Sequence, residues 1–308
     1  MKASIIVIAY NQEQYIEETI RSISSQKTDF EFEIIVGDDC STDNTPKLLE
    51  QLAKEIPQLK LLLHKENLGI IGNFMSVYNQ AEGEYVAETG GDDYWIDMSK
   101  LQNQVDFLEK NKEYSLCCTG YKRYYQNEGR FDEVQPETSE DISFEYLCRK
   151  NPINAATTMY RKSLIPILDE SFKAAPVEDW ILWLKYAKLG KVRFLKDVTA
   201  VYRIHDKSVY SGIDLSKSLL WKFEAREYIW KHFTTETSEE FFNEENRCVK
   251  TILCSVTESK QEKVDFLNRI IDMGFSKKVG LIKLLVRIDS RLSRSILWRL
   301  FDKMKMNS

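Results

Sequence analysis

The first 90 residues alternate between short apolar runs and segments of helical periodicity, and this alternation restricts the possible folds more than any other feature. A continuous apolar run at 3–9 predicts a strand buried on both faces, and mainly apolar runs at 32–36, 59–63 and 85–87 predict three further strands. Apolar residues recur at helical spacing over 15–23, 46–56 and 70–81, with Pro57 and Gly83 as the expected stops of the last two helices. This order predicts a mostly parallel sheet with helices on both faces.

The pattern loosens after about residue 112. Short apolar runs at 114–119, 157–160, 192–195 and 198–204 predict strands of a mixed extension of the sheet, and a helix is expected to start near Asp179. From about residue 214 onward the spacing is helical. We therefore expect an α/β domain over residues 1–212 and a helical C-terminal extension over residues 213–308.

Composition excludes several classes of protein. The chain has 308 residues, of which 43% are hydrophobic and 30% charged, which is typical of a globular protein. No apolar run approaches 18 residues, so no membrane-spanning helix is expected. A net charge of −5 argues against binding of nucleic acid. The six cysteines show no Cys-x-x-Cys pair, so a reducing cytoplasm is the simplest context, and the apolar N-terminus is interpreted as a core strand.

Two pairs of aspartates follow predicted strands at the edge of the sheet where open α/β proteins bind ligands. Asp38 and Asp39 follow the second strand, and Asp92 and Asp93 follow the fourth. Each pair alone is consistent with acids that cap the next helix. Together they favour a site for a divalent metal and a nucleotide. The sequence has no Gly-x-Gly-x-x-Gly loop and no P-loop, so a metal would have to neutralise a diphosphate.

Seven segments, in order, carry a resemblance to a known family. They are Ser4–Asn11 (SIIVIAYN), Glu33–Thr45 (EIIVGDDCSTDNT), Glu66–Gly69 (ENLG), Ala81–Tyr85 (AEGEY), Gly91–Trp95 (GDDYW), Val177–Trp180 (VEDW) and Tyr202–His205 (YRIH). Over about residues 3–210 the chain resembles the family 2 glycosyltransferases of bacterial polysaccharide synthesis. The resemblance implies a GT-A fold, which is a Rossmann-like mixed sheet flanked by helices, in residues 1–212. It also implies sugar transfer from a nucleotide-sugar with inversion at the anomeric carbon.

The resemblance assigns residues to the nucleotide-sugar. Asp39 matches the family position that accepts a hydrogen bond from the base, usually the uracil imide, which favours a UDP-linked donor. Tyr10 and Asn11 match the positions that pack against the base and the ribose. Further contacts with the nucleotide-sugar are expected from Ala9, Asp38, Asn67, Gly69 and Asp92.

The resemblance also implies a Mn²⁺ or Mg²⁺ site that stabilises the departing diphosphate. Asp92 and Asp93 match the acidic metal motif, and either of them can be the direct ligand. His205 matches the end of a Tyr-Arg-x-His motif that contacts metal or diphosphate, although a single histidine is also compatible with a structural role. Many members of the family have an acid where this chain has Gly90, which implies a weaker metal site or one completed by water and His205.

An inverting transfer needs a base that deprotonates the acceptor hydroxyl. Asp179 matches the family's base, with Glu178 as the second candidate, while the alternative is that Asp179 only caps a helix. If Asp179 is the base, burial or Trp180 must raise its basicity. Trp95 and Trp180 are candidates for stacking on sugars, whereas the helical spacing of Trp183 is typical of a core residue.

We therefore expect an inverting glycosyltransferase that acts on a saccharide or lipid-linked acceptor. A catalytically weak nucleotide-sugar-binding or assembly subunit is the alternative, supported by Gly90 alone. A sugar nucleotidyltransferase is disfavoured, because residues 10–15 (YNQEQY) lack the Gly-rich loop with Arg and Lys that such enzymes need after the first strand.

The C-terminal segment combines an apolar stripe with positive charge. From residue 277 to 308 there are nine Lys and Arg against two acidic residues. The stripe consists of Leu281, Leu285, Ile288, Leu292, Ile296, Leu300 and Met304. It predicts either packing on protein or peripheral contact of residues 277–305 with an anionic membrane, which would place the enzyme on the inner face of the cell membrane.

Overall fold

The computed structural model describes residues 1–134, 140–206, 208, 221, 224–226, 228, 229 and 231–233. The chain divides into two compact units. The first comprises Met1–Gly212 and Tyr228–Thr234, and the second comprises Ile213–Glu227 and Thr235–Ser308. The basic stripe at 277–305 and nearly all of the expected helical extension lie outside the described residues.

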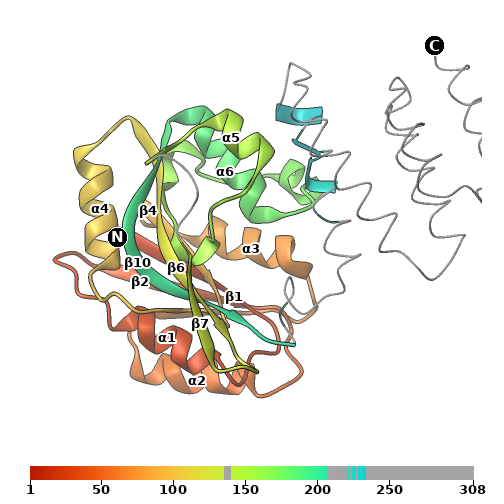
Figure 1. The fold of residues 1–308 in the computed structure, drawn as a ribbon. Coiled ribbons are helices and arrows are strands. Elements are labelled where there is room, and N and C mark those ends of the chain that lie inside the picture. The colour runs from red at the N-terminus through yellow and green to blue at the C-terminus, as the bar shows by residue number, and fades with distance from the viewer. Residues whose placement is uncertain are drawn as a thin grey trace, which may run out of the picture. The chain divides into compact units, whose positions relative to one another are not determined.

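The N-terminal half of the first unit is a parallel sheet (Figure 1). β1 (Ala3–Ala9) lies between β2 (Phe32–Asp38) and β4 (Tyr85–Gly90), and β3 (Leu59–Leu63) pairs with β2 at the edge. Ile5 pairs with Ile34 on one side and with Ala87 on the other, and β1 is buried from Ala3 to Val7. All four strands therefore end on the same side of the sheet.

The other half of the sheet is mixed, as expected. Its strands are β9 (Met159–Arg161), β6 (Tyr114–Tyr125), β10 (Lys191–Ile204) and β5 (Tyr94–Trp95), in that order from β4. β9 is antiparallel to both β4 and β6, β6 is parallel to β10, and β5 is antiparallel to β10. β7 (Arg130–Val134) pairs with β6, and β8 (Asp141–Ile142) pairs with β10.

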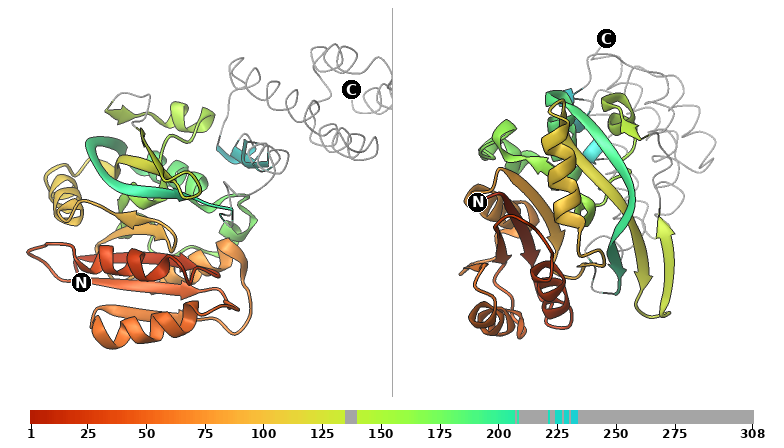
Figure 2. Two further views of the ribbon diagram at one scale, coloured as in Figure 1. Left: turned by 60° about the horizontal axis from the view of Figure 1, so that its bottom comes forward. Right: turned by 90° about the vertical axis from the view of Figure 1, so that its left-hand side faces the viewer.

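Helices cover both faces of the sheet (Figures 1 and 2). The apolar core on one face includes buried residues of α1 (Ile16–Ser24), α2 (Thr45–Glu55) and α4 (Lys100–Lys110). On the other face, α3 (Gly69–Gln80) packs against β2 at Gly37, and its Tyr78 contacts Tyr186 of α6 (Glu178–Leu189). α5 (Phe144–Arg149) contacts α6. Full burial of each large aliphatic side chain contributes about 1.5–3 kcal/mol.

The structure corrects two local expectations. Residues 192–195 and 198–204 belong to one strand, β10, whose register shifts near Val198 accommodate the polar Lys196 and Asp197 as a bulge. Gly83 does not end α3, which stops at Gln80. It instead passes over β1, where a Cβ on Gly83 would lie 2.4 Å from the backbone nitrogen of Ser4. Within the described residues, no helix has the length and apolar character needed to cross a bilayer.

Candidate active site

The loops that follow β1 and β2 are tied together by side chains. The Asn11 backbone N–H donates to Ser41 Oγ at 2.8 Å, and the Thr42 N–H donates to Asn11 Oδ1 at the same distance. Asn11 and Cys40 adopt left-handed φ values of 53° and 60°, which few residue types do readily. The two loops therefore form one rigid rim at the carboxyl ends of these strands.

The first aspartate pair organises this rim and does not cap α2, whose N-cap residue is Asn44. Asp38 is buried, and its Oδ2 accepts a hydrogen bond from the Ser41 N–H at 3.0 Å, while its Oδ1 has no hydrogen-bond partner among the described residues. Asp39 Oδ1 accepts from the Leu68 N–H at 2.6 Å. This bond holds the loop that leads into α3 against β2.

The other expected nucleotide contacts lie on the same rim. Ala9 is the last residue of β1, and its carbonyl accepts from the Asp39 N–H at 2.9 Å. Tyr10 has 48% of its surface exposed. Asn67 donates from Nδ2 to the Asp39 carbonyl at 3.0 Å, and Gly69 begins α3 with a φ of 73°. The structure thus gathers these residues near the ends of β1 and β2, whereas Asp92, which was also assigned to the nucleotide-sugar, lies in the turn after β4.

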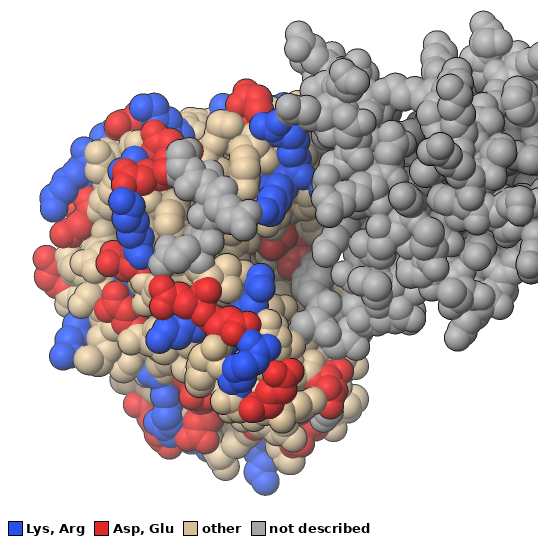
Figure 3. Space-filling model, viewed as in Figure 1, with Lys and Arg blue, Asp and Glu red and all other residues tan. Residues whose placement is uncertain are grey.

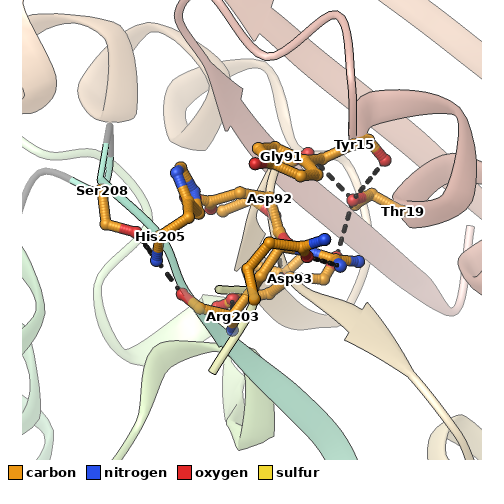
Figure 4. Close-up of polar contacts among 11 residues, drawn as sticks. Tyr15, Thr19, Gly91, Asp92, Asp93, Arg203, His205 and Ser208 are labelled. Atoms are coloured by element: carbon orange, nitrogen blue, oxygen red, sulfur yellow. Dashed lines mark hydrogen bonds and ion pairs between the residues drawn. The ribbon is translucent and has the colours of Figure 1, made fainter. Parts of the chain in front are cut away.

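The second aspartate pair lies in the turn between β4 and β5 (Figure 4). Asp92 Oδ2 lies 3.1 Å from His205 Nε2, although 113 residues separate the two in sequence. Asp93 Oδ1 accepts a hydrogen bond from the Arg203 backbone N–H at 2.9 Å. Neither aspartate caps α4, whose N-cap residue is Ser99. The end of β10 therefore meets the end of β4 at this turn.

The two aspartates differ in environment, which the sequence left open. Asp93 is buried, and burial, followed by the charge of Asp92, raises its pKa well above the usual range. The Asp92 side chain is 19% exposed, and the ring of His205 packs against Tyr15 with centroids 4.6 Å apart. Asp93 thus has a backbone partner inside the protein, whereas Asp92 faces His205 at the surface of the turn.

The residues at this turn fit an open metal site. Among the described residues, no three His, Cys, Asp or Glu side chains converge as a metal cluster. Asp92 and His205 supply one carboxylate and one imidazole, which both suit Mn²⁺. Mg²⁺ and similar ions commonly take one or two protein ligands and complete their shell with phosphate oxygens and water. Two protein ligands are therefore compatible with an ion bound together with a diphosphate.

Gly90 leaves room for the side chain of Asp92. A Cβ placed on Gly90 would lie 2.7 Å from Asp92 Oδ1, which is too close for an ordinary contact. The carboxylate of Asp92 thus occupies the space beside residue 90.

Glu178 and Asp179 are the first two residues of α6. Asp179 accepts hydrogen bonds from the Trp180 N–H and, at 3.4 Å, from Asn151 Nδ2. Burial outweighs these bonds and raises the pKa of Asp179 to about 6. By surface exposure Glu178 is buried and Asp179 is half-buried. A carboxylate with this pKa is ionised at neutral pH yet more basic than an exposed one, as a general base requires.

Glu88, a buried carboxyl group on β4, was not among the site residues predicted from the sequence. Its Oε2 accepts from the Tyr160 hydroxyl at 2.8 Å. Burial, followed by the charges of Asp179 and Glu178, raises its pKa well above the usual range. A signal was present, because this glutamate interrupts the apolar run of a buried strand. Glu88 thus extends the acidic group at the start of α6 into the core.

The tryptophans proposed for sugar stacking are buried. Trp95 is 5% exposed and packs beneath the Lys100 ammonium, and Trp180 is 7% exposed and donates from Nε1 to the Leu147 carbonyl at 2.7 Å. The hypothesis that they stack on sugars is therefore wrong for this structure. Trp183 is a core residue, as its spacing predicted.

Comparison with known proteins decides the family. The sequence profile described as "Glycosyl transferase family 2" matches residues 4–172, more than half of the chain. The chain belongs to glycosyltransferase family 2. Of the seven segments that carry the resemblance, the five that precede residue 100 lie within this match.

Relatives in bacteria support membership of family 2. The uncharacterised protein Rv1520 of Mycobacterium tuberculosis is 34% identical over 221 residues, which are 71% of this chain and 63% of that protein. The E. coli glucosyltransferase WfaP, named for UDP-Glc and a diphosphoundecaprenol acceptor, is 30% identical over 67% of this chain and 78% of its own length. The putative teichuronic acid glycosyltransferase TuaG of Bacillus subtilis is 28% identical over 76% of this chain and 91% of its own length.

Solved structures show that this family 2 chain has the GT-A fold. S. aureus TarS in complex with UDP-GlcNAc aligns with a TM-score of 0.54 and 20% identity over 83% of this chain and 82% of that one. A mannosyltransferase from Pyrobaculum calidifontis, solved with GDP-Man and Mn²⁺, aligns with a TM-score of 0.55 and 16% identity over 98% of this chain and 84% of that one. At these identities the likeness concerns the fold alone.

Proposed function

We propose that the protein is an inverting, metal-dependent glycosyltransferase that transfers a sugar from a UDP-linked donor to a hydroxyl of a saccharide or lipid-linked acceptor. The observation that carries this proposal is the meeting of Asp92 and His205 just after the carboxyl ends of β4 and β10, on the edge where Asp38 ends β2 and Asp39 follows it. The names of WfaP and TuaG support a role in cell-surface polysaccharide synthesis.

The rim residues bind and orient the donor in this proposal. Asp39 accepts the imide N–H of the uracil, because a carboxylate is a pure acceptor. Tyr10 and Asn11 flank the base and the ribose, and Asp38, Asn67 and Gly69 shape the loops around them. The diphosphate extends from the rim toward Asp92 and His205, which would hold the Mn²⁺ or Mg²⁺ ion. When bound, such an ion supplies charge stabilisation for the leaving diphosphate.

Asp179 acts on the acceptor. Its carboxylate accepts the proton of the acceptor hydroxyl while the hydroxyl oxygen forms a bond to the anomeric carbon. The bond from that carbon to the diphosphate breaks on the opposite face, so the configuration inverts and UDP leaves with the bonding electrons. The pKa of about 6 leaves Asp179 ionised at neutral pH. Glu178 is the second candidate for this role.

A metal-dependence assay tests the proposal. We expect the protein to release UDP from a UDP-sugar in the presence of a saccharide acceptor, to stop after EDTA treatment and to recover with Mn²⁺. Asp92→Asn should weaken Mn²⁺ binding in the presence of UDP by at least about 10-fold, because it removes a charged ligand. Asp93→Asn should weaken it far less, because an amide oxygen still accepts the hydrogen bond from the Arg203 N–H.

The same assay distinguishes an active glycosyltransferase from a catalytically weak binding subunit. A catalytically weak subunit, for which Gly90 is the supporting feature, would bind UDP without turnover above the background rate. Turnover that persists in EDTA would contradict the metal assignment.

A further inference from the structure

The side chain of Arg203 lies beside the Asp92 turn (Figure 4) and joins three separate elements through its guanidinium. Its side chain is 6% exposed. Nε donates to the Asp92 carbonyl at 2.9 Å, one terminal nitrogen donates to Gln126 Oε1 at 2.8 Å, and the other donates to Glu18 Oε2 at 2.5 Å. One side chain on β10 therefore connects the Asp92 turn, the end of β6 and α1.

Aromatic rings enclose the same guanidinium. Its central carbon lies 4.8 Å from the ring centroid of Tyr15, 5.0 Å from that of Tyr94 and 5.7 Å from that of Tyr124. Tyr15 also packs against His205. An Arg held by three acceptors among flat rings has little rotational freedom, and a Lys cannot reproduce this arrangement.

The turn is held from its other side as well. Thr19 Oγ1 lies 2.9 Å from the Gly91 carbonyl oxygen and 2.6 Å from the Asp93 carbonyl oxygen. Together with the bond from Arg203 Nε to the Asp92 carbonyl, these contacts hold three consecutive residues of the turn through their backbone. The Asp92 carboxylate is thereby directed toward His205.

We propose that Arg203 is a positioning residue that sets Asp92 and His205 in the geometry required to hold a divalent cation with a nucleoside diphosphate. It acts through Asp92 and not through direct contact with the diphosphate, because its side chain is nearly buried and each of its three nitrogens is already turned toward a protein acceptor. This inference rests on the proposed metal-dependent function.

Mn²⁺ binding tests this role without relying on catalysis. We expect Arg203→Lys to weaken Mn²⁺ binding in the presence of UDP about 10–100-fold, as loss of a residue that orients a ligand commonly does. Bound Mn²⁺ is measured by electron paramagnetic resonance, and binding of UDP without metal is measured by calorimetry and should be unchanged. Arg130→Lys is the matched control, because Arg130 packs on a neighbouring ring, Tyr125, but is exposed on β7.

Two variants that leave Arg203 in place and change its partners test the positioning role even if Arg203→Lys does not fold. Glu18→Ala and Gln126→Ala each remove one acceptor of the guanidinium, and both of these side chains are exposed. Each should weaken Mn²⁺ binding in the same direction by a smaller factor, with the thermal midpoint retained.

The outcomes separate this inference from the proposed function. If the unmodified protein binds no Mn²⁺ in the presence of UDP, the metal-dependent function itself fails. If it binds Mn²⁺ and the Arg203, Glu18 and Gln126 variants stay within about 2-fold of it, the positioning role is overturned. A loss of metal-free UDP affinity equal to the loss of Mn²⁺ affinity would also overturn it, because Arg203 would then contact the nucleotide.

Discussion

At the scale of single residues, the acidity of Asp179 gives the proposed mechanism a measurable pH dependence. Burial raises its pKa to about 6, and a general base works only when ionised. We expect kcat/KM to rise with pH through about 6 and then level off. Asp179→Asn should lower turnover about 10²–10⁴-fold with unchanged UDP affinity. Steady-state UDP release measures turnover, and calorimetry measures affinity.

Stability supplies an independent check on Asp179. A carboxyl whose pKa is raised by folding stabilises the folded state at low pH, and this contribution is lost as pH rises through the folded pKa of about 6. Asp179→Asn should therefore raise the thermal midpoint relative to the unmodified protein at pH 8 but not at pH 4. If Glu178→Gln abolishes turnover and Asp179→Asn does not, the base is Glu178.

Lys100 allows a second prediction at this scale. It is fully buried on α4, where Nζ donates to Gln104 Oε1 at 2.7 Å, and burial lowers its pKa to about 7. At pH values between about 7 and the ordinary pKa of lysine, Lys100 is protonated in the unfolded chain and largely neutral in the folded protein. The contribution of this group to the free energy of unfolding therefore rises with pH. Relative to Lys100→Met, the free energy of unfolding should increase by about 1 kcal/mol per pH unit near pH 8. Urea denaturation at pH 7.5 and 8.5 measures it.

At the scale of elements, α3 can approach β2 only because residue 37 is glycine. A Cβ there would lie 2.1 Å from Asn73 Oδ1 and 2.7 Å from Val77 Cγ1, and Asn73 Nδ2 also donates to the Gly37 carbonyl at 2.8 Å. Gly37→Ala should destabilise the protein by about 1–3 kcal/mol through overpacking. Urea denaturation measures this, and Lys54→Ala, on the exposed side of α2, should stay within about 0.5 kcal/mol.

The elements also show why part of the fold could be predicted. β1 and β3 have the predicted bounds. β1 was recognisable because a parallel strand buried in a sheet is a continuous apolar run, and β3 because leucines fill four of its five positions although it lies at the edge of the sheet. β5 and β7 were missed for two different reasons. Tyr94–Trp95 is only two residues long and depends on pairing with β10, more than 100 residues away. Arg130–Val134 is largely exposed and polar, so it carries no apolar pattern.

The site was predictable to a similar extent. The positions of the aspartates at strand ends follow from the sequence, whereas the pairing of Asp92 with His205 required the family resemblance. The difference in burial between Asp92 and Asp93 could be predicted neither from the sequence pattern nor from the family resemblance. It depends on the backbone N–H of Arg203, which tertiary pairing brings to Asp93.

At the scale of the whole molecule, acidic and basic residues are mixed over the face of the first unit shown in Figure 3, whereas residues 277–308 are strongly basic in sequence. We propose that residues 277–305 bind anionic membranes, where each Lys or Arg contributes about 1 kcal/mol. The protein should float with vesicles that contain phosphatidylglycerol, be released by high salt, and ignore neutral vesicles.

Charge reversal provides the matched control for this experiment. Replacing Arg287, Arg291 and Arg294 by Glu should abolish flotation. The same reversal at Lys27, Lys47 and Lys54, which are exposed in the first unit, should leave it intact. Flotation that is lost equally in both triple variants would indicate a dependence on net charge alone and would contradict a specific role for the segment.

Many members of the family have an acid where this chain has Gly90, and the contact between Gly90 and the Asp92 side chain affects what such an acid would do here. The Cβ of an Asp introduced there would lie 2.7 Å from Asp92 Oδ1, so the Asp92 carboxylate would have to shift. The oxygen that faces His205 belongs to the same carboxylate, so the shift would also change its distance from the imidazole. An acid added at position 90 therefore alters the existing pair of side chains as well as adding a ligand, and a redesign has to treat residues 90, 92 and 205 together.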